Sequence, residues 1–208
     1  MSRTLFLYVL VIFVTNNYHS QTFNPDKKLK FGFDIGANYT FLQIERPLQP
    51  AMSNINALNG TGLRIGLVMD NYINKKLSFM PKAELSFNDA RLSILNVDGS
   101  RETKVISPLT IEISSHLAIK LSDKLTKPYI LIGPALKIPI PDKSNPRASE
   151  INATIIAIDL GFGIDRTLKY FNFSPEIRYS YGLNNITNSD KINKMHLHNI
   201  SMVFIFKG

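Results

Sequence analysis

Serine and histidine residues at short spacing are the first side chains in this sequence that could do chemistry. Ser114 and His116 lie two residues apart, and His196 and His198 precede Ser201. Hydrolysis by a serine needs a base within hydrogen-bond reach and an acid that orients the base. Neighbours at i and i+2 of a strand lie roughly 6.5 Å apart by strand rise, beyond that reach. A lipid-modifying hydrolase is therefore the weaker alternative, and we predict no catalytic residue and no enzyme activity.

Metal and nucleic-acid chemistry find no support in the composition. The chain has four histidines and no cysteine, without the ligand spacing of a metal site, so we predict no metal and no cofactor. Disulfides and a lipoprotein anchor are excluded for the same reason. The formal net charge is +8, but the lysines are scattered over turns, loops and strand ends. Without a basic helix or an aromatic-interleaved basic patch, we predict no nucleic-acid partner.

A larger set of charged residues recurs at alternate positions of apolar segments. In 171–183, Phe, Pro, Ile, Tyr and Leu alternate with Asn, Ser, Glu, Arg and Gly. Successive strand side chains point to opposite faces, so this segment has one apolar and one polar face. Charges inside a narrow barrel cost several kcal/mol unless they pair, so we predict a structural polar network, with a proton or ion path as the alternative. Its six acids and four bases are Asp34, Arg64, Lys82, Glu84, Glu112, Lys120, Asp159, Asp165, Glu176 and Arg178.

The same two-residue alternation defines eight candidate strands. Their length suits tilted membrane-crossing strands, with the apolar face toward lipid and the polar face toward the lumen. A soluble barrel, with the apolar face as its core, is the competing interpretation. The segments are 30–42, 61–70, 77–87, 110–121, 128–138, 156–165, 171–183 and 200–206.

The connections between these segments alternate between long and short. Long loops are expected at 43–60, around 98–102, at 139–152 and at 184–195, and short turns at 71–76, at 122–127 and near 167–168. Outer-membrane barrels have short periplasmic turns and longer extracellular loops. The fold class we predict is all-β: an eight-stranded antiparallel up-and-down transmembrane β-barrel.

The first twenty residues have the composition of an export signal. Arg3 precedes an apolar run at 5–14, and polar residues follow at 16–20. This run is too short for a membrane-spanning helix and fits a secretory signal peptide, with cleavage near Ser20–Gln21. We therefore divide the chain into a signal peptide, 1–20, and an outer-membrane barrel domain, 21–208.

Several segments resemble the PorT-like outer-membrane β-barrel family. They are FDIGANYTFL, KPYILIGPAL, DLGFGID and SPEIRYSYGLNNI, and the resemblance covers most of residues 30–206. It implies an eight-stranded fold and a role in type IX protein secretion and gliding, and it brings no catalytic residues.

The function expected from these observations is that of a non-enzymatic outer-membrane scaffold. Its partners would be outer-membrane lipid and other envelope or secretion-system proteins. The alternatives are a surface binding protein or adhesin that uses loops 43–60 and 139–152, and a soluble periplasmic binder.

Overall fold

The computed structural model describes residues 28–45, 54–95, 99–106, 108–122, 124–140, 154–187 and 193–208. Within these ranges no helix is long and apolar enough to cross a membrane. The predicted signal peptide, its cleavage site and nearly all of the predicted loop 139–152 lie outside the described residues.

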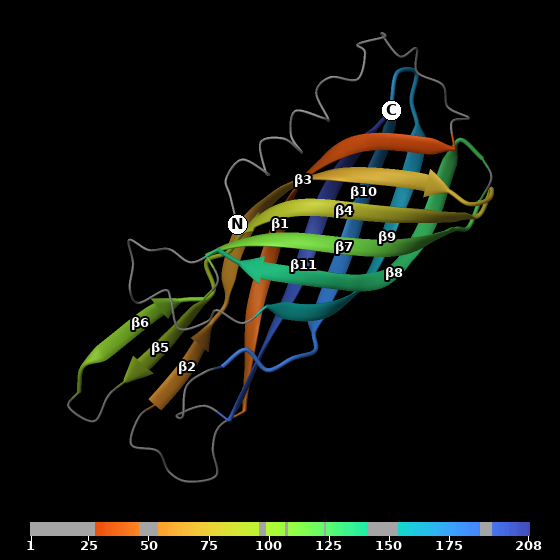
Figure 1. Ribbon diagram of the computed structural model, residues 1–208. Helices are drawn as coiled ribbons and strands as arrows, with labels where there is room; N and C mark the ends of the chain where they lie inside the picture. Colours follow the sequence, from red (N-terminus) through yellow and green to blue (C-terminus); the bar gives the residue numbers. More distant parts are fainter. Residues whose placement is uncertain are drawn as a thin grey trace, which may run out of the picture.

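Eight antiparallel strands close into a barrel, as predicted (Figure 1). Chain neighbours are paired throughout, and β1 closes the wall by pairing with β3 on one side and β11 on the other. The order around the barrel is β1-β11-β10-β9-β8-β7-β4-β3. The strands are β1 (Leu29–Glu45), β3 (Gly60–Tyr72), β4 (Leu77–Phe87), β7 (Leu109–Lys120), β8 (Thr126–Pro139), β9 (Ile155–Thr167), β10 (Asn172–Gly182) and β11 (Lys194–Lys207).

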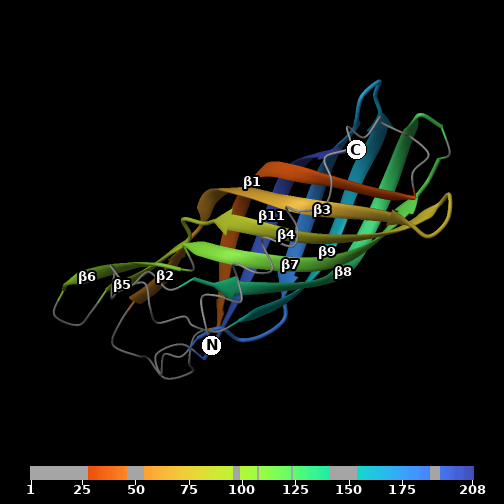
Figure 2. The ribbon, with the colours of Figure 1, turned by 45° about the horizontal axis from the view of Figure 1, so that its top comes forward.

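A second, three-stranded sheet corrects two of the predicted loops. It consists of β2 (Asn54–Leu58), β5 (Arg91–Leu95) and β6 (Arg101–Val105), in the order β2-β5-β6. Figures 1 and 2 show it standing beyond the barrel at the end opposite the short turns. The predictions of loop at 54–58 and at 101–102 were wrong, because both segments pair with β5 outside the barrel wall and lack its two-faced pattern.

The last strand is also longer than the sequence pattern indicated. β11 begins at Lys194, so the predicted loop 184–195 is too long at its end and the predicted strand 200–206 too short. In the added part, His196 and His198 occupy the outward positions that carry apolar residues in the rest of the strand, so the apolar alternation does not extend to this end. The antiparallel pairing of β11 with β1 reaches from Gly32–Lys207 to Glu45–Lys194.

Three outward-facing prolines interrupt the hydrogen-bonded ladders of the short hairpins. Pairing of β3 with β4 skips the positions around Pro81, pairing of β7 with β8 skips those around Pro134, and pairing of β9 with β10 skips those around Pro175. Each proline still pairs in register with its other neighbouring strand. Because proline has no N–H, it leaves one side of a strand without a donor, and in all three short hairpins this gap lies between the two strands of the hairpin.

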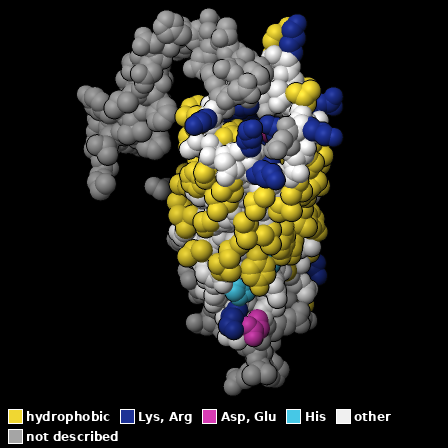
Figure 3. All heavy atoms as spheres, turned by 90° about the vertical axis from the view of Figure 1, so that its right-hand side faces the viewer, with side chains coloured by type: hydrophobic (Ala, Val, Ile, Leu, Met, Phe, Trp, Pro, Cys, Tyr) yellow, Lys and Arg dark blue, Asp and Glu magenta, His cyan; other side chains and the backbone are white. Residues whose placement is uncertain are grey.

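An apolar belt covers the outside of the barrel wall, and Figure 3 shows one side of it. Large hydrophobic side chains from every barrel strand are exposed there, among them Leu67 at 69%, Ile113 at 50% and Ile177 at 57%. Contiguous apolar surface of this extent is far beyond that of a soluble monomer. The polar interior and apolar exterior are the arrangement of a membrane-spanning barrel.

Aromatic rings gather at both margins of the belt. Near the short turns, Phe33 stacks on Phe206 with centroids 5.1 Å apart, and Phe173 stacks on Phe204 at 6.0 Å. At the long-loop margin, His198 lies 4.7 Å from the Tyr181 ring and 5.4 Å from the Phe41 ring. Aromatic girdles of this kind mark the two membrane interfaces.

Replacing Ile177 by arginine tests which face meets lipid. Ile177 lies near the middle of β10 on the apolar belt. We expect Ile177→Arg to destabilise the barrel by about 2–4 kcal/mol, because a cation at the midplane loses its hydration. The measurement is the free energy of unfolding in lipid vesicles by denaturant titration.

The conservative variant Ile177→Leu is the control and should unfold as the wild type does. Equal stability of the arginine and leucine variants would mean that this face does not contact the bilayer core.

Candidate functional site

The ten charged residues predicted for the lumen all lie buried inside the barrel, each with at most 3% of its surface exposed. They are Asp34, Arg64, Lys82, Glu84, Glu112, Lys120, Asp159, Asp165, Glu176 and Arg178. The polar face of every strand therefore turns inward, and the acids and bases of different strands meet across the interior.

Four further charged residues share the interior and change its charge balance. Lys30, Asp70, Lys137 and Lys207 are also at most 2% exposed. Each has the inward parity but lies near a strand end or, for Lys137, in the least regular segment. With them, the described interior holds seven acids and seven bases, in place of the predicted six and four.

Two arginines organise the central part of the interior. Arg178 Nη2 donates to both carboxylate oxygens of Glu84 at 2.7 Å, and its Nε lies 3.7 Å from Asp159 Oδ2. Arg64 bridges Glu84 at 3.2 Å and Glu112 at 3.1 Å. Guanidinium groups present several donors in a fixed plane, so one arginine can hold carboxylates from different strands.

Lysines complete this network on either side of the arginines. Lys82 Nζ lies 2.6 Å from Glu176 Oε1, and the Tyr129 hydroxyl donates to Glu176 Oε2 at 2.8 Å. Lys137 Nζ lies 3.4 Å from Glu112 Oε2. The carboxylates of β4, β7 and β10 thus each have a cation from another strand.

A separate ionic cluster fills the short-turn end of the interior. Lys207 Nζ donates to Asp70 at 2.8 Å, and Lys120 Nζ donates to Asp165 at 3.3 Å. The Tyr72 hydroxyl donates to Asp165 at 2.9 Å, and Lys120 Nζ lies 3.4 Å from the centre of the Tyr72 ring. Four strands are tied together here by two acids and two lysines.

Toward the long loops the interior loses its charge. An uncharged layer comes first, in which Asn38 donates to Ser86 at 2.7 Å and Asn199 donates to Thr40 at 2.7 Å. Beyond it lies a buried apolar cluster, which we call the apolar cap. The cap consists of Leu42, Ala90, Leu92, Ile106, Ile155, Ile186, Met195 and Leu197.

The serine and histidine candidates do not form a hydrolytic pair in the described structure. His116 Nε2 lies 2.9 Å from Asp159 Oδ2, while Ser114 Oγ has no hydrogen-bond partner among the described residues. Ser201 donates to Asn199 inside the barrel. His198 faces outward, with its Nε2 3.1 Å from Gln43 Oε1. Within the described residues, His116 therefore pairs with an acid and not with Ser114, and His198 lies on the outer side of the wall from Ser201.

Asp34 is the exception in the ionic interior. It is fully buried, and neither of its carboxylate oxygens accepts a hydrogen bond from a described residue. No group of three or more metal-binding side chains occurs in the described part of the chain. The geometry supports a structural network more directly than a ligand or metal site.

A closed barrel with an apolar belt outside and paired charges inside defines an outer-membrane β-barrel protein. The chain belongs to the family described as outer membrane protein beta-barrel domain, which matches residues 19–188. No curated protein matches the chain.

Three solved outer-membrane proteins are similar to this chain at low identity. OprG from Pseudomonas aeruginosa is 13% identical, with 86% of this chain and 94% of that chain covered and a TM-score of 0.45. Neisserial surface protein A is 13% identical, with 85% and 97% covered and a TM-score of 0.48. Ail of Yersinia pestis is 9% identical, with 88% and 100% covered and a TM-score of 0.44.

A double-mutant cycle on Lys82 and Glu176 tests the interior pairing. Lys82→Met should destabilise the barrel by about 3–5 kcal/mol, because it leaves a buried carboxylate without its closest cation. Adding Glu176→Gln should recover much of this loss, because the amide is neutral and its oxygen still accepts from Tyr129. The measurement is the unfolding free energy of the four proteins in lipid.

The same substitution at an exposed pair provides the control. Lys194 and Glu45 are 3.3 Å apart, with side chains 55% and 56% exposed. Lys194→Met should cost less than about 1 kcal/mol. A Lys82→Met effect as small as this would show that the interior is hydrated.

The filled interior also predicts that the protein does not conduct ions. An eight-stranded barrel is narrow enough for side chains to fill it, and here an apolar cap lies above the charged layers. Purified protein in planar bilayers should give no steady conductance. The cap variant Leu42→Ala/Leu197→Ala should stay closed as well, because the ionic layers below are intact. Stable channel steps from the wild type would contradict this packing.

Proposed function

We propose that the protein is a non-enzymatic outer-membrane anchor whose three-stranded sheet binds a protein partner at the cell surface. The observation that carries the proposal is the contrast between the two parts. The interior of the barrel is filled and capped, whereas β2, β5 and β6 stand beyond it (Figure 1). A filled barrel suits anchoring, and a sheet outside the membrane suits recognition.

The way the sheet is joined to the barrel supports this role. Ala90 and Leu92, on either side of the start of β5, are buried in the apolar cap together with Leu42 and Leu197 of the wall. The backbone N–H of Ile106 donates to the Ala90 carbonyl at 2.7 Å, which closes the base of the β5–β6 hairpin. The sheet is therefore held on the cap by packing as well as by the chain.

The edges of the sheet suggest how a partner would bind. Within the described residues, β2 and β6 each pair on one side only, with β5. Unpaired strand edges offer backbone donors and acceptors to an added strand. Strand addition to β2 or β6 is the recognition mode that we propose.

The partner that we propose is a component of a secretion machine of the type IX and gliding class. This part rests on the resemblance of 30–206 to the PorT-like family. A barrel that cannot conduct would act in such a machine as a scaffold or assembly factor, and the exported protein would cross elsewhere. The alternative is an adhesin, in which the same sheet binds a ligand outside the cell.

Excision of the β5–β6 hairpin tests the proposal. Residues 91–105 can be replaced by Asn-Gly, because Ala90 and Ile106 are already joined by a backbone hydrogen bond. The variant should enter the outer membrane and keep its heat-modifiable mobility, but lose crosslinks to its partner. Cells should then retain secretion cargo in the periplasm.

Excision also removes the contact of Leu92 with the apolar cap. A milder variant, Arg91→Ser/Arg101→Ser, changes the surface of the hairpin and keeps this contact, so it serves as the control. Normal secretion with lost binding to an external ligand would favour the adhesin. Normal secretion and normal binding after excision would contradict a role for the sheet.

A further inference from the structure

The short-turn end of the barrel carries a ring of exposed cations. Six basic side chains are exposed there, and no exposed acid accompanies them among the described residues of that end. We call this set the basic rim. Its members are Lys28, Lys75, Lys76, Lys124, Arg166 and Lys169.

The net positive charge of the protein lies outside the barrel interior, where the basic rim is. The fourteen buried charges cancel, so residues outside the interior carry the whole formal net charge of +8. At the other end, two pairs of opposite exposed charges are in contact, Glu45 with Lys194 at 3.3 Å and Asp89 with Arg91 at 2.8 Å. None of the rim cations forms an ion pair with a described acid. The rim is thus available to an anionic partner.

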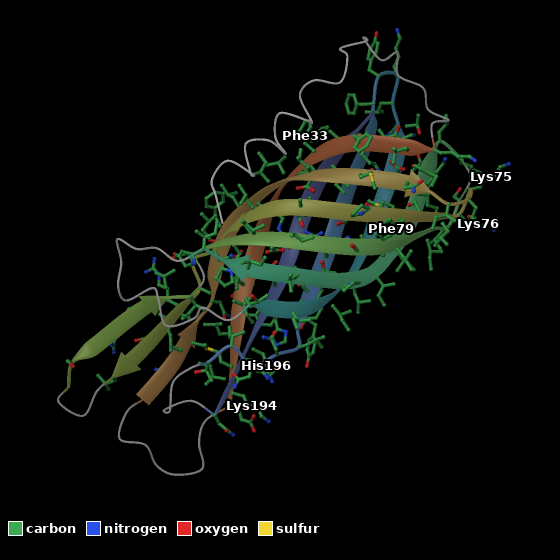
Figure 4. The ribbon with its side chains drawn as sticks, in the orientation of Figure 1. Phe33, Lys75, Lys76, Phe79, Lys194 and His196 are labelled. Carbon is green, nitrogen blue, oxygen red and sulfur yellow. The ribbon has the colours of Figure 1, made fainter. Side chains whose placement is uncertain are left out.

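The cations surround the barrel. Lys75 and Lys76 belong to the turn between β3 and β4, Lys124 to the turn between β7 and β8, and Lys169 to the turn between β9 and β10. Lys28 immediately precedes β1, and its carbonyl accepts a hydrogen bond from the Tyr72 N–H at the end of β3 at 2.7 Å. In the closed order of strands these four places divide the circumference, so every quarter of the barrel has a cation. Figure 4 shows the Lys75–Lys76 turn at the end opposite Lys194.

Exposed apolar side chains accompany the cations in each turn. Ile73 is 58% exposed, Leu125 74% and Tyr170 69%. Lys169 Nζ lies 5.2 Å from the centre of the Tyr170 ring. Figure 3 shows Lys and Arg gathered at this margin of the apolar belt. Apolar residues at acyl-chain depth with lysines just outside match the membrane interface.

We propose that the basic rim binds the headgroups of anionic phospholipids in the periplasmic leaflet. Short turns face the periplasm in outer-membrane barrels, so the rim meets that leaflet. A protein partner would contact one side of the barrel, whereas lipid surrounds it as the cations do. Basic residues next to an anionic membrane surface each strengthen association by about fivefold.

Lipid selectivity in reconstituted vesicles tests the proposal. The full-length mature protein is refolded in phosphatidylcholine vesicles that contain a minority of phosphatidylglycerol. Spin-labelled phosphatidylglycerol and phosphatidylcholine then report the relative association of each lipid with the barrel. We expect the anionic lipid to be favoured by about fivefold or more, and high salt to reduce the preference.

Variants of the basic rim test whether its cations cause the preference for anionic lipid. Substitution of all six rim cations by glutamine should bring the two lipids to nearly equal association. The pair Lys75→Gln/Lys76→Gln should give a partial loss, which keeps the test open if the six-residue variant fails to fold. The matched control removes cations from the opposite end, as Arg91→Gln/Arg101→Gln/Lys194→Gln, and should keep the preference.

Two results would overturn the proposal. One is equal association of both lipids with the wild type, and the other is an unchanged preference in the rim variants. Capture of an acidic periplasmic protein through the rim, with no lipid preference, would assign the ring to that protein. Hairpin excision at the other end leaves the rim intact, so failure of the surface-binding proposal would not alter this test.

Discussion

The constraint on which this structure depends is that a backbone in hydrocarbon must satisfy its own hydrogen bonds. Strands meet it only by closing on themselves, because an open edge would leave donors and acceptors without partners. Closure with eight strands fixes a narrow interior, and a narrow interior excludes the water that would hydrate charged side chains. The seven acids and seven bases inside are the electrostatic result: each sign is present in the amount that neutralises the other.

The need for a closed, narrow barrel also gives the interior and the two ends of the barrel different roles. Arg64 and Arg178 hold carboxylates of β4, β7 and β9 within a few ångströms, so the ionic network braces the wall across its interior. Side chains committed to such a network are poor candidates for binding and release. Contacts with binding partners are therefore left to the two ends of the barrel, where the strands leave the bilayer. The three-stranded sheet lies at one end and the basic rim at the other. The apolar cap separates the sheet from the charged interior.

Much of the barrel could be predicted from residue parity, and the limits have physical causes. Lipid on one side and neighbouring side chains on the other enforce an alternation that any membrane strand must show, so ten interior charges were identified from the sequence. Lys30, Asp70 and Lys207 were missed because they lie at strand ends, where too few residues remain for the alternation of polar and apolar side chains to be recognised. Strands β2, β5 and β6 were missed because they lie outside lipid, where neither face is required to be apolar. Which acid meets which base depends on the closed order of strands, which parity does not contain.

The pairing of β1 with β11 has a kinetic meaning. Gly32 pairs with Lys207, so the seam joins residues from opposite ends of the chain, and contacts of such long range form slowly. Asp70 and Asp165 receive Lys207 only when β11 is in place. Until that moment the nascent wall has two open edges and carboxylates that still require water. Folding of the barrel is therefore expected to be cooperative, with dehydration of the interior as its final event, and its intermediates would depend on factors that shield the open edges.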